Sequence, residues 1–480
     1  MEANFFTPAT PESCGVSSEW IVNFASELAK QLPNQVPHGW ALYRHKKLLA
    51  KAIYKPFDDT TPQMVCSVSK SFTSTAIGFC VQEGLVKVTD KIADYFPDKL
   101  PENVQKEMLN VTVEDLLSMR VGQKSEIVHK GADNKDEPDR VRDFFSNPIV
   151  YPVGSIFGYN GSLTHTLAAL VNRLTGMDIL DYLNDRLFKK LGMPIPPTPR
   201  TAAGLIWADS GMRFTQDQIA RLGQFYLDKG VWNGEQILSR EWCESATSAH
   251  IGTENCGTGI DWQQGYCYQF WRGRHNTFRF CGAYGQFCIV MPDLDAMFVY
   301  QGGTDNEKIQ FVVPIFYDMI MSKMSADVNV LPENPEAFAK MQKMLSELTV
   351  NCINSTKSPL ESAICKQKFT SDLVNLKEIT FDFEGDRLTV DAIVSDGTHL
   401  VYPAGRYGYE CTDERVQSSF CHMDECDDSV YASSFYWEQP GHLVVTTHLL
   451  ASMTMFKIDA IFDREGAKIS LKTIRGKYDK

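Results

Sequence analysis

A serine and a lysine three residues apart lie in the segment MVCSVSKSFTSTAIGFC, residues 64–80. The segment predicts a helix over 67–82, closed by Gly84. Positions i and i+3 of a helix share a face, so the Lys70 amine is within reach of the Ser67 hydroxyl. A serine becomes a good nucleophile when a neighbouring base takes its proton. A lysine can be that base when burial and neighbouring cations lower its pKa.

The same two residues also have an ordinary structural interpretation. Chance produces a Ser-x-x-Lys pattern on the order of once or twice in a chain of 480 residues. Ser67 would then be a helix N-cap, with Lys70 in solvent. At a helix N-terminus the N–H of Ser67 itself lacks an intrahelical acceptor and can stabilise an oxyanion. The spacing alone leaves catalysis and capping open.

The elements around this pair indicate how the chain must position it. Residues 20–32 have apolar side chains at helical spacing, and GWALYRHKKLLAKAIY predicts two strands around a turn at His45–Lys46. Helical segments and loops follow Gly84, and after residue 260 the pattern becomes that of strands, with a turn at Pro292–Asp295. Since helices separate the two groups of strands, the sheet must pair early strands with late ones.

The last part of the chain is a separate unit. The polar stretch SADVNVLPENPEAF predicts a linker, in which Asn334 caps a helix with Pro335 at its first position. From about residue 370 the pattern is strand-rich. We therefore expect a first domain over 1–325, a linker and helix over 326–352, and a C-terminal β-rich domain over 353–480.

Composition excludes some function classes. The formal net charge of −13 argues against a nucleic-acid partner and against an anionic membrane surface. No run of about 18 apolar residues predicts a membrane span, and the N-terminus lacks the pattern of a secretory signal. The 13 cysteines are odd in number and scattered, which favours free thiols in a reducing compartment. We therefore expect a cytoplasmic protein.

A family resemblance extends the Ser-x-x-Lys hypothesis. The segment VCSVSKSFTSTAIGFCVQEGLVKVTDKIADYFP resembles the nucleophile helix of the serine β-lactamase and penicillin-binding-protein-like hydrolases, which include class C β-lactamases, DD-peptidases and esterases. Segments similar to later family motifs follow in order: VTVEDLLSMRVG, PVGSIFGYNGSLTHTLAALVNRLTG, GMRFTQDQIARLGQFYLDKGVWNG and CGAYGQFCIVMPDLDAMFVY. The resemblance covers about residues 10–322. It implies an α+β fold of the DD-peptidase/β-lactamase-like transpeptidase type, an antiparallel sheet flanked by helices with an inserted helical subdomain, followed here by the C-terminal β-rich domain, barrel-like in some relatives.

The resemblance also implies roles for individual residues. Ser67 would be the acylated nucleophile and Lys70 its base partner. The second motif of the family would be Tyr159-Asn160-Gly161, in which Tyr159 relays protons between the nucleophile, the lysine and the leaving group. The family usually has asparagine or serine where Gly161 stands, so Asn160 or Ser162 would have to contribute the missing side chain to substrate binding.

The third motif departs further from the family pattern. The family usually has lysine or histidine, a small residue and glycine, where this chain has Phe280-Cys281-Gly282. Gly282 would still let the strand approach the substrate, and the N–H groups of Ala283 and Ser67 would form the oxyanion hole. Arg279 or His275, or an arginine just upstream, would supply the missing positive charge; the alternative is a charged turn in solvent. The loss of the cation argues against β-lactamase activity.

The expected reaction is therefore acyl transfer through an acyl-enzyme on a small ester or amide, without a cofactor or metal. A carboxylesterase is the leading hypothesis; an amidase or D-amino-acid peptidase, a β-lactamase and an inactive binding protein of the same fold remain alternatives. The run CHMDEC, with Cys411 upstream, matches no zinc spacing. The C-terminal domain would either cover the active-site mouth or mediate dimerisation, so a homo-oligomer stays open.

Overall fold

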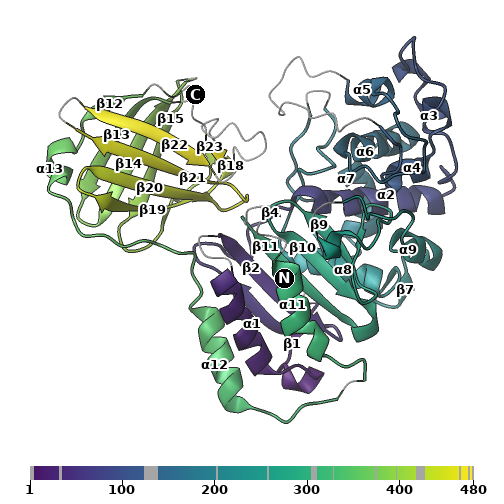
Figure 1. The fold of residues 1–480 in the computed structure, drawn as a ribbon, viewed down its shortest axis with the longest axis horizontal. Helices are drawn as coiled ribbons and strands as arrows, with labels where there is room; N and C mark the ends of the chain where they lie inside the picture. Colours follow the sequence, from purple (N-terminus) through teal and green to yellow (C-terminus); the bar gives the residue numbers. More distant parts are fainter. Residues whose placement is uncertain are drawn as a thin grey trace.

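The computed structural model describes residues 5–31, 35–123, 139–201, 204–256, 259–303, 311–327, 329–371, 373, 376–395, 397–417, 428–463, 466–473 and 476–477. Three lobes are visible in Figure 1: a sheet flanked by helices, a helical lobe beside it, and a C-terminal lobe of strands. No helix in these ranges is long and apolar enough to cross a membrane. The CHMDEC run lies outside the described residues.

The first sheet has the strand order β1-β3-β2-β11-β10-β9-β8. Its strands are β1 (Thr7–Pro8), β2 (Pro37–Arg44), β3 (Lys47–Ile53), β8 (Trp271–Arg272), β9 (Phe278–Gly282), β10 (Gln286–Met291) and β11 (Ala296–Gly302). His45 and Lys46 both have positive φ, which suits the tight turn between β2 and β3. β2 pairs antiparallel with β11, so the early strands meet the late ones as predicted.

Helices cover both faces of this sheet. α1 (Ser18–Gln31) and α11 (Val312–Met319) pack on one face, where Phe24 and Phe316 contact Phe298 of β11. α8 (Gln216–Leu227) packs on the other face; a Cβ added at its Gly223 would lie 2.8 Å from Cys288 Sγ. This close approach explains a glycine inside a helix. α9 (Arg240–Ala246) and the short pairs β4 (Gln63–Met64) with β5 (Arg213–Phe214) and β6 (Val231–Trp232) with β7 (Glu235–Gln236) complete this part.

The helical lobe is built around α2 (Ser69–Gln82) and α6 (Gly161–Thr175), which lie against each other (Figure 1). α3 (Ile92–Tyr95), α4 (Val113–Leu117), α5 (Arg140–Ser146) and α7 (Ile179–Leu183) surround them. Gln269, a buried residue with φ of 65°, joins three of these helices: it accepts from Thr164 of α6 and Ser71 of α2, and donates to Leu116 and Leu117 of α4. α2 is therefore fixed from several sides.

The linker helix and the C-terminal sheet follow the predicted pattern. Asn334 caps α12 (Pro335–Ser346) by accepting from the N–H of Ala337. After α13 (Leu360–Ile364), a long sheet curls around its own apolar core (Figure 1). Its strands, with one short separate pair, are β12 (Lys368–Thr370), β13 (Leu376–Glu384), β14 (Arg387–Val394), β15 (His399–Gly405), β16 (Glu410–Cys411), β17 (Val416–Gln417), β18 (Asp428–Ser429), β19 (Tyr431–Gln439), β20 (His442–Leu449), β21 (Met455–Phe462), β22 (Ala467–Thr473) and β23 (Gly476–Lys477).

The C-terminal sheet packs directly against the segment that precedes Ser67. The N–H of Met64 donates to the carbonyl of Ala451, in the turn after β20, at 2.9 Å. Met64 and Cys66 are buried in the same apolar cluster as Met453 of that turn. The turn after β20 therefore lies directly beside the segment that leads into Ser67.

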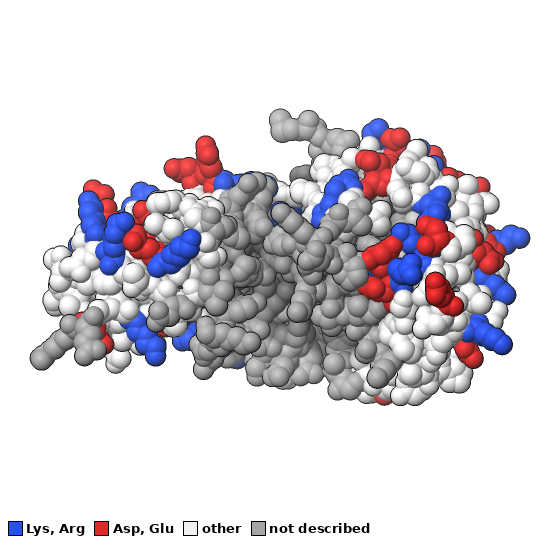
Figure 2. Space-filling view, turned by 90° about the horizontal axis from the view of Figure 1, so that it is seen from above, with Lys and Arg blue, Asp and Glu red and all other residues white. Residues whose placement is uncertain are grey.

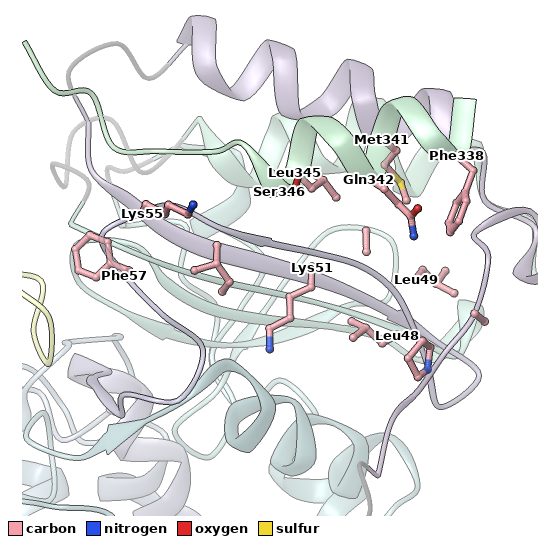
Figure 3. A pocket seen from close by; sticks show the side chains of 14 residues that line it. Leu48, Leu49, Lys51, Lys55, Phe57, Phe338, Met341, Gln342, Leu345 and Ser346 are labelled. Carbon is pink, nitrogen blue, oxygen red and sulfur yellow. The ribbon is translucent and has the colours of Figure 1, made fainter. Parts of the chain in front are cut away.

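A surface groove lies apart from Ser67. A groove of about 540 Å³ lies between β3 and α12, lined by apolar side chains such as Phe338 and Met341 together with Lys51 and Lys55, and Ser67 is not among its lining residues (Figure 3). In Figure 2 basic and acidic side chains are interspersed on both lobes of the face shown. On the described residues of that face they form no continuous basic stripe of the kind that nucleic-acid binding favours.

Candidate active site

Ser67 lies in a short 3-10 turn, Cys66–Val68, between β4 and α2. The predicted helix over 67–82 is confirmed in extent, but its first turn is of the tighter 3-10 type. Ser67 caps neither helix, so the capping interpretation is wrong; the residues at the caps are Val65 and Val68. Cys66 has a φ of 47°, a region that residues with a side chain rarely adopt. Such strain is common where a side chain must be held for chemistry.

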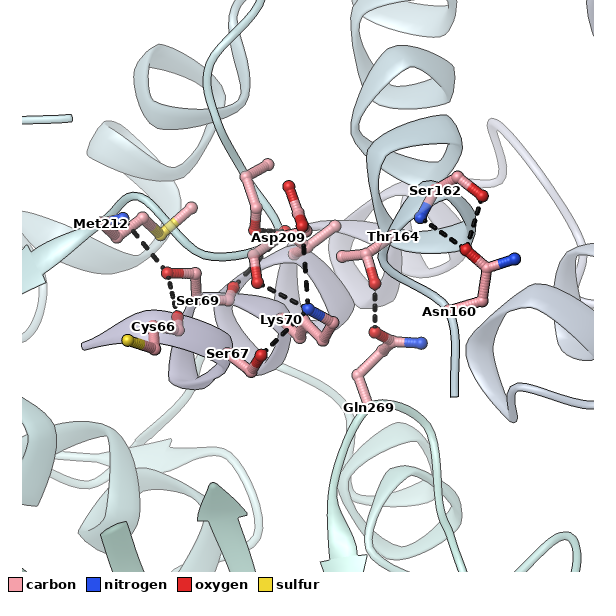
Figure 4. A network of polar contacts seen from close by, with 12 residues as sticks. Cys66, Ser67, Ser69, Lys70, Asn160, Ser162, Thr164, Asp209, Met212 and Gln269 are labelled. Carbon is pink, nitrogen blue, oxygen red and sulfur yellow. Dashed lines mark hydrogen bonds and ion pairs between the residues drawn. The ribbon is translucent and has the colours of Figure 1, made fainter. Parts of the chain in front are cut away.

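Lys70 is enclosed beside Ser67 and does not lie in solvent. Its exposed fraction is 3%. Lys70 Nζ donates to Ser67 Oγ at 3.1 Å and to the backbone carbonyl of Asp209 at 2.7 Å (Figure 4). One contact is set by the helix spacing, and the other comes from a loop 139 residues further along the chain. The amine is thus fixed next to the hydroxyl.

Tyr159 also lies beside Lys70, with its ring centroid 5.2 Å from the lysine Nζ. Its ring is half-buried and stacks against Trp271, at 5.9 Å between centroids and 22° between planes. Tyr266 meets the same ring edge-on at 6.1 Å. These contacts fix the orientation of the tyrosine beside the lysine.

Asn160 is used to begin α6. Its side-chain oxygen accepts from the N–H of Ser162 and from the Ser162 hydroxyl, and its amide nitrogen donates to Gln123. The side chain is 4% exposed. These contacts engage both ends of the amide, so its position favours a role in holding Tyr159 and α6 rather than in binding substrate.

Gly282 brings β9 against the Ser67 turn. A Cβ added at Gly282 would lie 2.3 Å from the Val65 carbonyl oxygen and 3.1 Å from Cys66 Cβ. No larger residue fits there without movement. Ala283 follows directly, at the start of the β9–β10 loop, where Tyr284 has a φ of 61°. The β9–β10 loop therefore begins close to the 3-10 turn that contains Ser67.

Arg279 and His275 are two of the residues predicted to replace the missing positive charge of the third motif. Arg279 is fully buried; its guanidinium donates to the carbonyls of Asp261 and Arg272 and lies 4.6 Å from the Trp262 ring centroid. His275 is exposed in the turn that precedes β9, at the end of that strand opposite Gly282, with its ring 6.0 Å from that of Tyr317. These positions do not favour a role for either residue in binding substrate beside Ser67.

The order of these elements and the Ser67 turn are those of one known family. The family model described as Beta-lactamase matches residues 34–307. The chain belongs to the β-lactamase family. It is thereby a hydrolase of the β-lactamase and penicillin-binding-protein superfamily, with the fold that the resemblance implied.

Similar proteins and structures agree with this assignment. The chain is 23% identical, over 61% of its length and 79% of the relative, to the 6-aminohexanoate-dimer hydrolase of Paenarthrobacter ureafaciens. A structure of a putative 6-aminohexanoate-dimer hydrolase from Bacillus anthracis is similar with a TM-score of 0.53 and 20% identity, over 65% of this chain and 86% of that one. A penicillin-binding protein homologue from Caulobacter crescentus is similar with a TM-score of 0.52 and 14% identity, over 65% and 98%. At such identities the structures show the fold alone.

Asp209 is a residue of this β-lactamase-family site that the sequence did not point to. Besides its carbonyl contact, one carboxylate oxygen lies 3.9 Å from Lys70 Nζ, and the other lies 3.8 Å from Arg140 Nη1. Arg140 is 7% exposed, and its guanidinium lies 4.9 Å from the Trp207 ring centroid. A single acidic residue in a loop carries no pattern that could have identified it.

Proposed function

We propose that the protein is an acyl-serine hydrolase in which Ser67 is the nucleophile, Lys70 its base and Tyr159 a proton relay. The observation that carries the proposal is the 3.1 Å contact between Lys70 Nζ and Ser67 Oγ, made by a lysine that is 3% exposed. Burial favours the neutral amine over the ammonium, and only the neutral amine can accept the serine proton.

The geometry supports a two-step reaction. Ser67 Oγ attacks the substrate carbonyl carbon while its proton passes to Lys70 Nζ. The negative oxygen that forms accepts hydrogen bonds from the N–H groups of Ser67 and Ala283. The leaving group receives a proton by way of Tyr159, and its bond to the carbonyl carbon breaks, which leaves an acyl group on Ser67. Water then attacks this ester, gives up a proton to the same groups, and releases the acid and the free serine.

We propose small carboxylic esters as the first substrate class. Phe280, which occupies the place of the family's third-motif cation, is fully buried in the core of the first domain. A β-lactam carboxylate would therefore lack its usual partner there. Amides of small amino acids are the second class, and the relatives named as 6-aminohexanoate-dimer hydrolases favour it, since two such amino acids are joined through an amide.

The test compares wild type with Ser67→Ala on p-nitrophenyl acetate and butyrate and on the linear dimer of 6-aminohexanoate, with intact mass recorded after quenching. The proposal predicts turnover and an acyl adduct in the wild type and neither in the variant. Ester turnover without dimer cleavage supports the first class, and dimer cleavage supports the second. Equal turnover by Ser67→Ala would contradict the proposal, as would a wild type that neither turns over nor is labelled on Ser67 by a fluorophosphonate.

A further inference from the structure

We propose that Asp209 and Arg140 are positioning residues that together set the proton affinity of Lys70. The inference rests on the proposed function of Ser67 and Lys70 and goes beyond it by assigning roles to two residues outside the catalytic motifs. Its starting point is a line of three enclosed charged groups, with the Asp209 carboxylate 3.9 Å from Lys70 on one side and 3.8 Å from Arg140 on the other.

The backbone of the Asp209 loop is fixed to α2 independently of its carboxylate. The Ala208 carbonyl accepts from the Thr73 hydroxyl at 3.0 Å, and the N–H of Met212 donates to the Ser69 hydroxyl at 3.1 Å. The Asp209 carbonyl accepts from Lys70 at 2.7 Å (Figure 4). The backbone of this loop therefore helps to fix the position of the lysine amine. The Asp209 carboxylate is not needed for that and acts on the amine through its charge.

The charge of Asp209 presents a difficulty for a lysine base. A carboxylate about 4 Å from an amine favours the ammonium, which cannot accept the serine proton. The contact is too long for a hydrogen bond and acts as a charge contact in an enclosed setting, since the Asp209 side chain is 11% exposed. Alone, this carboxylate would hold the proton on Lys70.

Arg140 resolves that difficulty. With Lys70 neutral, the Asp209 carboxylate and the Arg140 guanidinium remain as a pair without net charge, which costs less in an enclosed site than an unpaired carboxylate would. With Lys70 protonated, the same pair still stabilises the ammonium through the nearer Asp209. The pair would thus place the neutral and charged forms of Lys70 close in free energy, as a group that takes and returns a proton requires. Among the described titratable residues, Tyr159 also lies near the lysine amine, with its ring centroid 5.2 Å from Nζ.

Two substitutions should move the pH dependence in opposite directions. If only neutral Lys70 can accept the serine proton, the rate of Ser67 acylation should rise with pH as Lys70 loses its own proton. Asp209→Asn keeps the backbone carbonyl and removes the charge, so the rise should move to lower pH by roughly one to three units. Arg140→Gln leaves the Asp209 charge without its partner, so the rise should move to higher pH.

The measurement is the rate of Ser67 modification by a fluorophosphonate, followed by intact mass between about pH 5 and pH 10. Arg140→Lys keeps the positive charge and should leave the rise near its wild-type position. Thr73→Val removes the loop contact at Ala208 without changing a charge, so it can lower the rate but should not move the rise. A wild type that is not labelled would contradict the proposed function itself.

A labelled wild type, with rises in Asp209→Asn and Arg140→Gln that do not move or that move the same way, would overturn this inference alone. The inference predicts a separate direction of the pH shift for each variant. If circular dichroism shows that one variant does not fold, the pH shift of the other variant still tests the inference.

Discussion

Gly282→Ala tests whether the approach of β9 to the Ser67 turn is needed for catalysis. An added Cβ would lie 2.3 Å from the Val65 carbonyl oxygen, where ordinary van der Waals contact begins at 3.4 Å. The obstructing atom is backbone, so relief requires the strand and the turn to separate by roughly 1 Å. The same movement would carry the Ala283 N–H away from the carbonyl oxygen of a bound substrate.

The expected effects follow from that displacement. Loss of one oxyanion donor lowers kcat by about 10²–10³-fold, and a misplacement of this size is enough for a comparable effect. The strain should also lower the free energy of unfolding by about 1–3 kcal/mol, the usual range for overpacking. Activity should therefore fall far more than the folded fraction does at 25 °C.

The assay is p-nitrophenyl butyrate hydrolysis with urea unfolding of the same preparations. Gly408→Ala is the matched control, because its added Cβ would meet nothing within 4 Å and Gly408 does not have a positive φ. The control should keep wild-type kcat and stability. A Gly282→Ala variant with kcat within about threefold of wild type would refute the assignment of Ala283 to the oxyanion hole.

Three further predictions concern other parts of the molecule. Burial lowers the pKa of His38 and of His448 from 6.5 to about 3. As the pH falls below about 6.5, the unfolded chain takes up protons at these histidines before the folded chain does. The free energy of unfolding should therefore fall by up to about 1.4 kcal/mol per pH unit for each histidine on acidification toward pH 3. Urea unfolding at pH 7, 6 and 5 should show this dependence of the free energy of unfolding on pH, and His448→Gln should make the dependence weaker. A variant with the same dependence as wild type would contradict the assignment to His448. Tyr159→Phe should lower kcat by about 10²–10⁴-fold with little change in thermal stability, and a wild-type kcat would exclude a proton relay there. Met453→Ala should lower the free energy of unfolding by about 2–5 kcal/mol in urea titrations and also slow Ser67 labelling by a fluorophosphonate. Labelling at the wild-type rate would show that the turn after β20 does not support the Ser67 turn.

Much of the framework follows from local rules. The Ser67 and Lys70 contact needs only helix spacing, and the Asn334 cap needs only a short polar side chain before a proline. The pairing of β2 with β11 follows from the order of strands and helices along the chain. In each case the partners are neighbours in sequence or are required by topology, so the pattern of residue types is sufficient.

The parts that sequence did not predict depend on partners distant along the chain. Asp209 contacts Lys70 through a backbone carbonyl, which any residue type could supply. The sequence therefore contains no motif from which this contact could be predicted. Arg279 is one of the residues that the sequence offers as a cation for the substrate, with a charged turn in solvent as the alternative, but the carbonyl of Asp261 and the ring of Trp262 enclose it. The sequence around a charged residue in a strand does not show whether its side chain faces solvent or is buried, because that depends on neighbours distant along the chain.

The conformation of the Ser67 turn is held from two parts of the chain at once. The N–H of Val65 donates to the Met212 carbonyl at 3.0 Å, while the N–H of Met64 donates to Ala451 of the C-terminal lobe. Between these bonds and Ser67 lies Cys66, whose positive φ persists only if its surroundings impose it. Cys66 is itself buried in the apolar core of the C-terminal sheet. The C-terminal sheet is therefore part of the scaffold that holds the Ser67 turn, and we expect its contribution to appear in the rate of Ser67 labelling as well as in stability.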